Sequence, residues 1–231
     1  MRTLVISDIH GELAKFEKLL SAASYEAGKD QLILLGDYID RGPNSRGVVD
    51  KVMQLKKEGA IVLKGNHDDM MEMAFEEKSH MKRWLRNGGI QTLLSYGYEL
   101  PRAETSGLDQ LIKKISPLSK TETVQEHLAF FRELDHYYET DDYIFVHAGV
   151  HPATPLASTD PFVLMWIREE FHNGYNGEKK VVFGHTPTHN LHDGCDVYFG
   201  SNNIIGIDGG CVYGGRLNAF ELPGNGIYFV E

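Results

Sequence analysis

The chain has 231 residues, of which 42% are hydrophobic and 24% are charged, a composition typical of a globular domain with one sizeable core. Its net charge is −10, so it lacks the basic surplus with which proteins bind the phosphates of nucleic acids. We therefore expect no nucleic-acid partner, and an anionic substrate would have to be met by local arginines or by a metal ion.

The N-terminal segment and the cysteines indicate the compartment. The segment MRTLVISDIHGE (1–12) contains only a short apolar run, too short for the core of a signal peptide. No apolar stretch approaches the ~20 residues that a membrane-spanning helix needs. Cys195 and Cys211 form no disulfide pattern and are interpreted as structural thiols. We expect a cytoplasmic protein that does not contact a membrane.

Short apolar runs of strand length recur along the chain. They lie at 3–7, 31–36, 60–65, 143–149, 180–186 and 203–210, and LNAFEL and GIYFVE are two further candidates at the end. Such continuous hydrophobicity indicates strands that are buried on both faces. Between the first three runs, residues 12–23 and 45–59 have the apolar spacing of helices. This β-α-β-α-β order predicts an α/β fold with a parallel sheet.

Residues 68–140 have a different character, because they are more charged and carry amphipathic segments. Helices are expected at 68–86, 106–120 and 123–134. We interpret this part as a mostly helical insertion or cap within a single domain that spans residues 1–231. Residues 151–162, rich in Pro, Ser and Thr, are expected to form a loop. Coiled-coil heptads are not visible, so we expect a monomer.

Polar side chains follow the apolar runs at the points where the strands are expected to end. In chain order they are Asp8, His10, Asp37, Asn66, His67, His147, His185 and Asp208. The carboxyl ends of parallel strands lie at one edge of a sheet, where open α/β sheets bind ligands. Turn formation alone does not explain so many oxygen and nitrogen donors at that edge, and we expect these side chains to meet there.

The chemistry of these donors favours divalent metal ions. The candidate ligands are Asp8, His10, Asp37, Asn66, His147 and His185, which offer oxygen and nitrogen atoms and no thiolate. Such a set suits hard to borderline ions such as Mn²⁺, Fe²⁺, Zn²⁺ or Mg²⁺. Six ligands are too many for a tetrahedral site that keeps one position open. They suit two octahedral ions that share a bridging carboxylate.

Five motifs together resemble the metallophosphoesterase superfamily. They are SDIHG (7–11), GDYIDRG (36–42), GNHD (65–68), VHAG (146–149) and GHTP (184–187). Within the superfamily they resemble the phosphoprotein phosphatase family, which contains Ser/Thr phosphatases of small bacterial and phage type and diadenosine-tetraphosphatase relatives. The resemblance implies the calcineurin-like fold, a central β-sandwich flanked by helices. Ser7 stands where the family usually has Gly, an exchange expected to be harmless, and Asp68 stands where eukaryotic members carry Glu.

The resemblance also implies a role for each ligand. The first ion would be held by Asp8, His10 and Asp37, and the second by Asp37, Asn66, His147 and His185, with Asp37 as the bridge. We expect Mn²⁺, with Fe²⁺, Zn²⁺, Mg²⁺ and Ni²⁺ as alternatives. The implied reaction is hydrolysis of a phosphoester by in-line attack of a metal-bound hydroxide.

Four further residues are expected to take part in catalysis. His67 would protonate the leaving oxygen, and Asp40 would hold the other ring nitrogen of His67. Arg41 would bind the phosphate, and Arg168 in LMWIREE would assist because it resembles an arginine that follows a Leu-Trp pair in small phosphatases. The alternative for Arg168 is a surface position on a helix. The remaining histidines, His189 among them, are interpreted as structural or surface residues.

Several functions are compatible with this pattern. Arg168 favours a phosphatase that acts on phosphoserine and phosphothreonine in proteins. The alternative is a hydrolase of dinucleoside polyphosphates. Two less favoured functions are a promiscuous small-molecule phosphatase and a non-catalytic metal-binding module. Pro187 stands where nucleases of the superfamily carry a second metal-binding histidine, which argues against a nuclease. Asp208 either supports a metal-binding histidine or belongs to a Gly-rich hairpin without such a contact.

Overall fold

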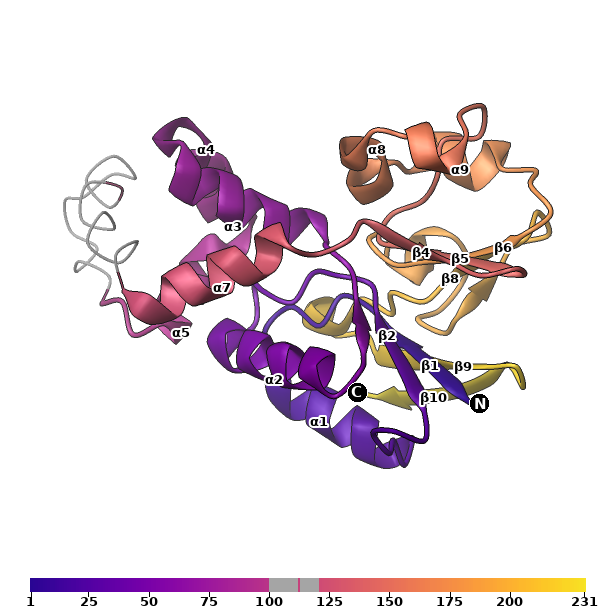
Figure 1. Cartoon of the computed structure of the whole chain (residues 1–231), viewed down its shortest axis with the longest axis horizontal. Helices are drawn as coiled ribbons and strands as arrows, with labels where there is room; N and C mark the ends of the chain where they lie inside the picture. The colour runs from indigo at the N-terminus through magenta and orange to yellow at the C-terminus, as the bar shows by residue number, and fades with distance from the viewer. Residues whose placement is uncertain (100–111, 113–120) are drawn as a thin grey trace.

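Two five-stranded β-sheets form the centre of the molecule (Figure 1), in a computed structural model that describes residues 1–99, 112 and 121–231. The first sheet has the order β10-β9-β1-β2-β3. Its parallel strands are β1 (Thr3–Ile6), β2 (Gln31–Leu34) and β3 (Ile61–Val62), and its antiparallel strands are β9 (Leu217–Leu222) and β10 (Gly226–Val230).

The second sheet has the order β4-β5-β6-β8-β7. Parallel strands form its centre, namely β5 (Tyr143–Val146), β6 (Lys180–Phe183) and β8 (Ile204–Gly206). Antiparallel strands form its edges, namely β4 (Tyr137–Glu139) and β7 (Tyr198–Phe199). The predicted α/β sandwich with parallel strands is therefore confirmed.

The parallel strands are mostly hydrophobic because both faces of each sheet are covered where these strands lie. Val5, Ile33 and Leu63 of the first half pack with Phe145, Val182 and Ile205 of the second half in one buried cluster between the sheets. The alternate residues of β1, Leu4 and Ile6, pack instead with side chains of α1 (Leu13–Ala22) and α2 (Ser45–Lys57). The period of two along a strand thus sends one set of side chains to each layer.

The outer face of the second sheet is covered in the same way. Val181, Phe183 and Ile204 pack with Leu164 of α8 (Pro161–Trp166) and Phe171 of α9 (Glu169–Gly174). Figure 1 shows α8 and α9 above this sheet and α1 and α2 against the first one. The layers are therefore helix, sheet, sheet and helix, and the loops that follow the parallel strands emerge at one rim of the sandwich.

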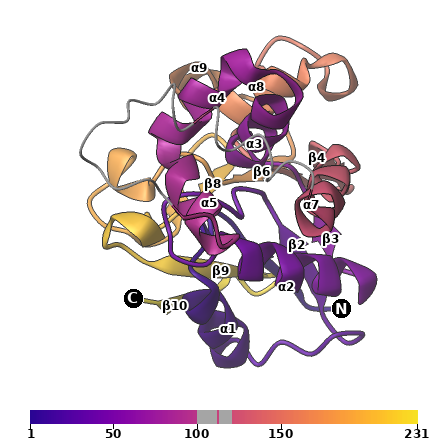
Figure 2. The same ribbon diagram turned by 90° about the vertical axis from the view of Figure 1, so that its left-hand side faces the viewer.

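The segment predicted as a helical insertion is mostly helical where the structure describes it, and the strand β4 lies near its end. It contains α3 (Asn66–Glu76), α4 (Lys78–Trp84), a π-type turn at Leu85–Gly89, α5 (Ile90–Ser95) and α7 (Glu122–Arg132). These helices gather on one side of the sandwich, the side that faces the viewer in Figure 2. The helix expected at 106–120 lies outside the described residues except for Ile112. The assignment of one domain with an insertion stays a prediction.

Some elements differ from the sequence analysis. The strands β4 and β7 are only three and two residues long, too short for an alternating pattern to reveal. The expected loop at 151–162 contains a 3₁₀ turn at Leu156–Ser158 and the start of α8. The cysteines remain unpaired. Across residues 1–99 and 121–231, the helices are all too short or too polar to cross a membrane.

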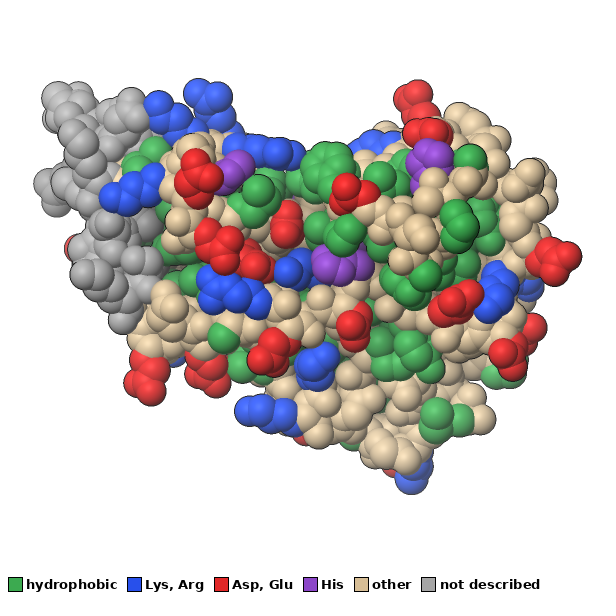
Figure 3. Space-filling model, turned by 45° about the horizontal axis from the view of Figure 1, so that its top comes forward, with side chains coloured by type: hydrophobic (Ala, Val, Ile, Leu, Met, Phe, Trp, Pro, Cys, Tyr) green, Lys and Arg blue, Asp and Glu red, His purple; other side chains and the backbone are tan. Residues whose placement is uncertain are grey.

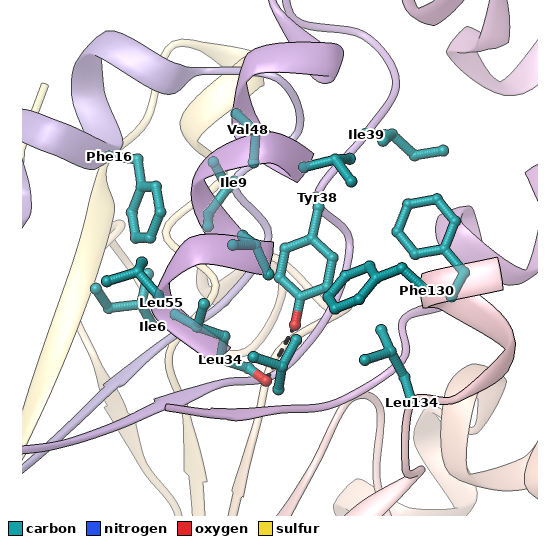
Figure 4. Close-up of a cluster of buried hydrophobic side chains, with 14 of the residues drawn as sticks. Ile6, Ile9, Phe16, Leu34, Tyr38, Ile39, Val48, Leu55, Phe130 and Leu134 are labelled. Atoms are coloured by element: carbon teal, nitrogen blue, oxygen red, sulfur yellow. Dashed lines mark hydrogen bonds between the residues drawn. The ribbon is translucent and has the colours of Figure 1, made fainter. Parts of the chain in front are cut away.

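Tyr38 anchors the loop after β2 inside the core (Figure 4). Its ring lies among apolar side chains that include Leu34 and Val48, and the residue has no exposed surface. The hydroxyl oxygen lies 2.7 Å from the carbonyl oxygen of Leu63 and 3.2 Å from that of Leu34, and it accepts a hydrogen bond of 3.1 Å from the N–H of Gly36. A polar side chain thus ties the ends of β2 and β3 together within the core.

Replacing Tyr38 by Phe removes this hydroxyl and leaves buried backbone groups without their partner. We expect the free energy of unfolding to fall by about 1–3 kcal/mol, the usual cost of an unsatisfied buried polar group. Urea denaturation measures the change, with Tyr138→Phe as the matched control because Tyr138 is 38% exposed. Equal free energies of unfolding in the two variants would show that the Tyr38 hydroxyl does not stabilise the contact between the ends of β2 and β3.

Candidate active site

The loops at the carboxyl ends of the parallel strands surround a cavity of about 440 Å³. Seven residues predicted from the sequence line it, namely Asp8, Asp37, Arg41, Asn66, His67, Arg168 and His185. The other three, His10, Asp40 and His147, lie buried behind this wall. Figure 3 shows the surface hollowed between the side that carries α4 and the side that carries α8 and α9. The structure therefore brings all ten predicted residues to one place.

The backbone at the site is strained. Six of the predicted site residues have a positive φ angle, namely Asp8, His10, Asp37, Asp40, Arg41 and His185. Few residues other than glycine adopt this conformation, and it costs on the order of 1–3 kcal/mol per residue unless the surroundings enforce it. Such strain clusters at functional sites, where it aims side chains that regular turns would not aim.

A close approach of two loops places Asp37 beside Asn66. A Cβ atom on Gly65 would lie 2.2 Å from the backbone nitrogen of Asp37, so only glycine fits there. The carboxylate of Asp68 fastens the contact, because it accepts hydrogen bonds from the N–H groups of Gly65, Asp37 and Tyr38 at 2.9–3.1 Å. Asp68 is fully buried. It shapes the site and does not face the cavity.

Two groups of side chains have the spacing of a metal site. One group is His10, Asp37 and His67, and the other is Asp37, His147 and His185, with the donor atoms of each group within 4.8 Å of one another. Asp37 belongs to both groups, as a bridging ligand would. The first group differs from the predicted ligands, because it contains His67, which was predicted as the acid, in place of Asp8. The Nδ1 atom of His185 lies 2.8 Å from Oδ1 of Asn66. A side-chain oxygen and a ring nitrogen from two different loops therefore lie close together, as ligands of one cation do.

Backbone carbonyls fix the orientation of two histidines. The Nδ1 atom of His10 lies 2.7 Å from the carbonyl oxygen of Ile39, and that of His147 lies 2.9 Å from the carbonyl oxygen of Leu35. Since a carbonyl only accepts, both Nδ1 atoms carry the proton and both Nε2 atoms offer a lone pair. The His147 Nε2 atom faces Asn66 Oδ1 at 2.9 Å. Neither of these two atoms carries a proton for the other, so a cation bound to both would stabilise the arrangement.

The electrostatics of the buried groups agree with a cation site. Burial, followed by the nearby charge of Asp8, raises the pKa of Asp37 well above its usual value. Burial lowers the pKa of His10 and His185 well below the usual value and also lowers that of His147. The lowered pKa values favour neutral histidines, the form that binds a metal ion, and a bound cation would favour the ionised form of the clustered carboxylates. The donor set fits the predicted metal centre.

Asp8 is held by its neighbours in a way that sequence analysis did not anticipate. Its Oδ2 atom accepts hydrogen bonds from the hydroxyl of Ser7 and, at 3.0 Å, from the N–H of His185. Ser7 is only 2% exposed. The serine that replaces the usual glycine therefore has a partner, and that partner is a predicted metal ligand.

His67 and Asp40 form a buried pair. The Nδ1 atom of His67 lies 2.6 Å from Asp40 Oδ2. The other oxygen of Asp40 accepts hydrogen bonds from the Trp84 indole N–H at 3.0 Å and from the Thr92 hydroxyl at 2.7 Å. Burial raises the pKa of Asp40 to about 7, while these hydrogen bonds and the charge of Arg41 oppose the rise. Burial, followed by the charges of Arg41 and His147, lowers the pKa of His67.

Arginines and aromatic rings shape the open part of the cavity. Arg41 donates to Nε2 of His10, and its guanidinium lies 5.3 Å from the centre of the Tyr213 ring. Arg168 donates to the carbonyl oxygen of His185 at 3.4 Å. Arg83 of α4 lies 4.7 Å from the ring centre of Trp166 of α8. Arg168 is thus placed at the cavity and not on a remote surface.

Sequence analysis missed several residues of the wall. They are Asn87, Trp166, Asn190 and Tyr213, together with His189, which was assigned no role in the site. Pro187 and Asp208 also line the cavity. The carboxylate of Asp208 accepts a hydrogen bond of 2.8 Å from the N–H of Gly210. The missed residues do not directly follow an apolar run, so the pattern that indicated the other site residues does not mark them. The one signal in the sequence is that some of them lie in or beside the motifs GHTP and WIRE.

Replacing Ser7 by Ala removes the hydroxyl that orients Asp8. We expect Mn²⁺ to bind about tenfold more weakly, because groups that orient metal ligands usually contribute 10- to 100-fold to metal affinity. Calorimetric titration of the metal-free protein with Mn²⁺ measures the affinity without any substrate. Ser79→Ala is the control, since the Ser79 hydroxyl bonds only to exposed Glu77. Unchanged affinity in Ser7→Ala would mean that the Ser7 hydroxyl contributes nothing to metal binding.

Comparison with known proteins agrees with the geometry. The sequence profile of the calcineurin-like phosphoesterase family matches residues 1–222. The chain is 27% identical to the asymmetrical bis(5'-nucleosyl)-tetraphosphatase PrpE of Oceanobacillus iheyensis, over 96% of this chain and 89% of that protein. It is also 27% identical to serine/threonine-protein phosphatase 1 of Salmonella typhimurium, over 94% of this chain and 90% of that protein.

Solved structures agree as well. The crystal structure of a provisionally named diadenosine tetraphosphatase superposes with a TM-score of 0.70 at 26% identity and covers 99% of this chain and 92% of that one. The family and the fold expected from the five motifs are confirmed. This chain belongs to the calcineurin-like phosphoesterase family and is a metallophosphoesterase.

Proposed function

We propose that this phosphoesterase hydrolyses a phosphoanhydride bond of dinucleoside polyphosphates. The observation that carries the proposal is the pairing of Arg41 with the ring of Tyr213 at the cavity, which Trp166 and Arg168 also line. The Tyr213 side chain is 60% exposed, so its ring face is available to a nucleobase. Guanidinium groups bind a phosphate chain, and aromatic rings stack on bases. The name of the PrpE relative, a bis(5'-nucleosyl)-tetraphosphatase, supports the same substrate class.

The six predicted ligands would hold two divalent ions, for which we propose Mn²⁺. Asp8, His10 and Asp37 would bind one, and Asp37, Asn66, His147 and His185 the other. When bound, the ions activate a water molecule for in-line attack and neutralise charge on the phosphoryl oxygens. Arg41 and Arg168 bind the remaining phosphoryl oxygens and orient the chain toward attack.

His67 supplies the proton for the leaving group in this proposal. Asp40 holds Nδ1, so Nε2 is the atom that donates to the oxygen of the broken bond. Burial lowers the pKa of His67 and so disfavours the protonated form that a general acid requires. The adjacent carboxylate of Asp40 stabilises the protonated form.

A phosphatase acting on phosphoserine or phosphothreonine in proteins is the second candidate. It is favoured by the Salmonella relative, which matches this chain at the same 27% identity as the PrpE relative. Sequence analysis placed this function first because of Arg168. An arginine that binds a phosphoryl group serves both substrates equally, so Arg168 does not separate them. The exposed ring of Tyr213 favours the dinucleotide.

We expect kcat/KM to be higher for diadenosine tetraphosphate than for a phosphothreonine peptide. Initial rates on the two substrates, with protein stripped of metal and reloaded with Mn²⁺, measure the difference. Tyr213→Leu should raise KM for the dinucleotide about tenfold, since stacking on a base contributes about 1–3 kcal/mol, and leave p-nitrophenyl phosphate unaffected. Phe229→Leu is the matched control, an exposed aromatic on β10.

His67→Asn controls for the chemistry and should lower kcat at least about 100-fold on every substrate whose leaving group needs a proton. Preference for the peptide, with no effect of Tyr213→Leu, would transfer the assignment to the protein phosphatase. If neither substrate is hydrolysed and His67→Asn behaves like the wild type, both candidates are wrong.

A further inference from the structure

The helical side of the molecule reaches the buried Asp40–His67 pair directly. Both oxygens of the Asp40 carboxylate are engaged, Oδ2 with His67 and Oδ1 with Trp84 and Thr92. All four residues are at most 3% exposed. A carboxylate held at both oxygens cannot rotate about its last bond. The orientation of the His67 ring is therefore coupled to two side chains of the helical segment.

Thr92 also holds the backbone of Asp40. Its hydroxyl oxygen accepts a hydrogen bond of 2.9 Å from the Asp40 N–H and lies 3.1 Å from the hydroxyl of Ser45, which bonds to the same N–H. Asp40 has a φ of 73°, a conformation that its surroundings must enforce. Thr92 thus bonds to both the main chain and the side chain of one strained residue. Within α5 (Ile90–Ser95), it is the only residue that does so.

The turn between Trp84 and Thr92 closes over the same residues. The carbonyl oxygen of Gly88 accepts a hydrogen bond of 3.3 Å from the N–H of Arg41. Gly88 has a φ of 112°, and a Cβ atom there would lie 2.7 Å from Cγ of Arg41. No side chain fits in this approach. The backbone angles of Gly88 are not helical, so the chain kinks within Leu85–Gly89 and bends around Asp40 and Arg41.

From these contacts we infer that Trp84 and Thr92 are positioning residues for the general acid. The helical segment would complete the active site by holding Asp40, which in turn aims Nε2 of His67 at the leaving oxygen. The inference rests on the proposed role of His67. Ordinary core packing is the competing explanation, since the Trp84 ring also lies 5.5 Å from the ring of Phe75.

The two explanations differ in how the loss depends on the leaving group. A misplaced acid slows only reactions in which the departing oxygen needs a proton, whereas loosened packing slows all substrates alike. Phenyl phosphate has a poor leaving group and 2,4-dinitrophenyl phosphate a good one of similar size. Both are small enough to be independent of the physiological substrate.

The experiment compares Thr92→Val with the wild type on these two esters in Mn²⁺. We expect kcat/KM for phenyl phosphate to fall at least about tenfold and that for the dinitrophenyl ester to change by about twofold or less. Thr92→Ser, which keeps the hydroxyl, should restore the rate on phenyl phosphate. Trp84→Phe, which removes the N–H donor together with part of the buried ring, should also lower the rate on phenyl phosphate more than the rate on the dinitrophenyl ester.

Two further variants make the result decisive. Thr140→Val removes a half-buried hydroxyl that bonds within the turn before β5, at the end of the strand remote from His147, and should leave both rates unchanged. In the His67→Asn background, Thr92→Val should have no additional effect, because the two changes remove the same acid. Far-UV circular dichroism and urea denaturation of each variant identify any that is unfolded.

Equal losses on both esters in Thr92→Val and Trp84→Phe, or full additivity with His67→Asn, would overturn the inference and assign the two residues to packing. Failure of the wild type to hydrolyse the esters and diadenosine tetraphosphate alike would instead overturn the proposed function, and with it the acid that the inference concerns. The two failures are therefore distinguishable in one set of rates.

Discussion

The buried carboxylate of Asp37 is the point on which the rest of the site depends. It follows β2, the strand between β1 and β3, and its Oδ1 atom accepts a hydrogen bond of 2.9 Å from the N–H of His67. Its oxygens also lie 3.5 Å from ring nitrogens of His10 and His147. One residue thus connects loops from both sheets. The burial that makes its charge unfavourable on its own also makes a bound cation effective there.

Much of the fold and site could be predicted from sequence because the signals are local. An apolar run followed at once by Asp8, Asp37 or Asn66 indicates both a buried strand and a polar loop at its end. The topology then brings those loops together, since parallel strands share one edge. Nine of the ten predicted site residues converge for this reason, although each motif alone is compatible with an ordinary turn. Arg168 lies instead between α8 and α9. The proposed roles of the individual residues go beyond their position.

The rest could not be predicted because it depends on contacts between distant segments. Thr92 lies 52 residues from Asp40 in the sequence, and a threonine in an amphipathic helix gives no local indication of a buried partner. Ser7 was judged by its type, whereas its effect depends on the side chain of Asp8 beside it. Tyr213 and Trp166 form part of the cavity only after two loops have packed. The residues that bind phosphate are the same for a nucleotide and for a phosphoprotein, so motifs alone do not separate these substrates.

Anomalous diffraction from crystals of the protein grown with Mn²⁺ tests the central claim most directly. The account predicts two peaks that share Asp37, one beside Asp8 and His10 and the other beside Asn66, His147 and His185. It also predicts that His67 remains bonded to Asp40 and outside both coordination spheres. A single peak, peaks away from Asp37, or His67 bound as a ligand would contradict the account, because either the shared centre or the proton donor would then be lost.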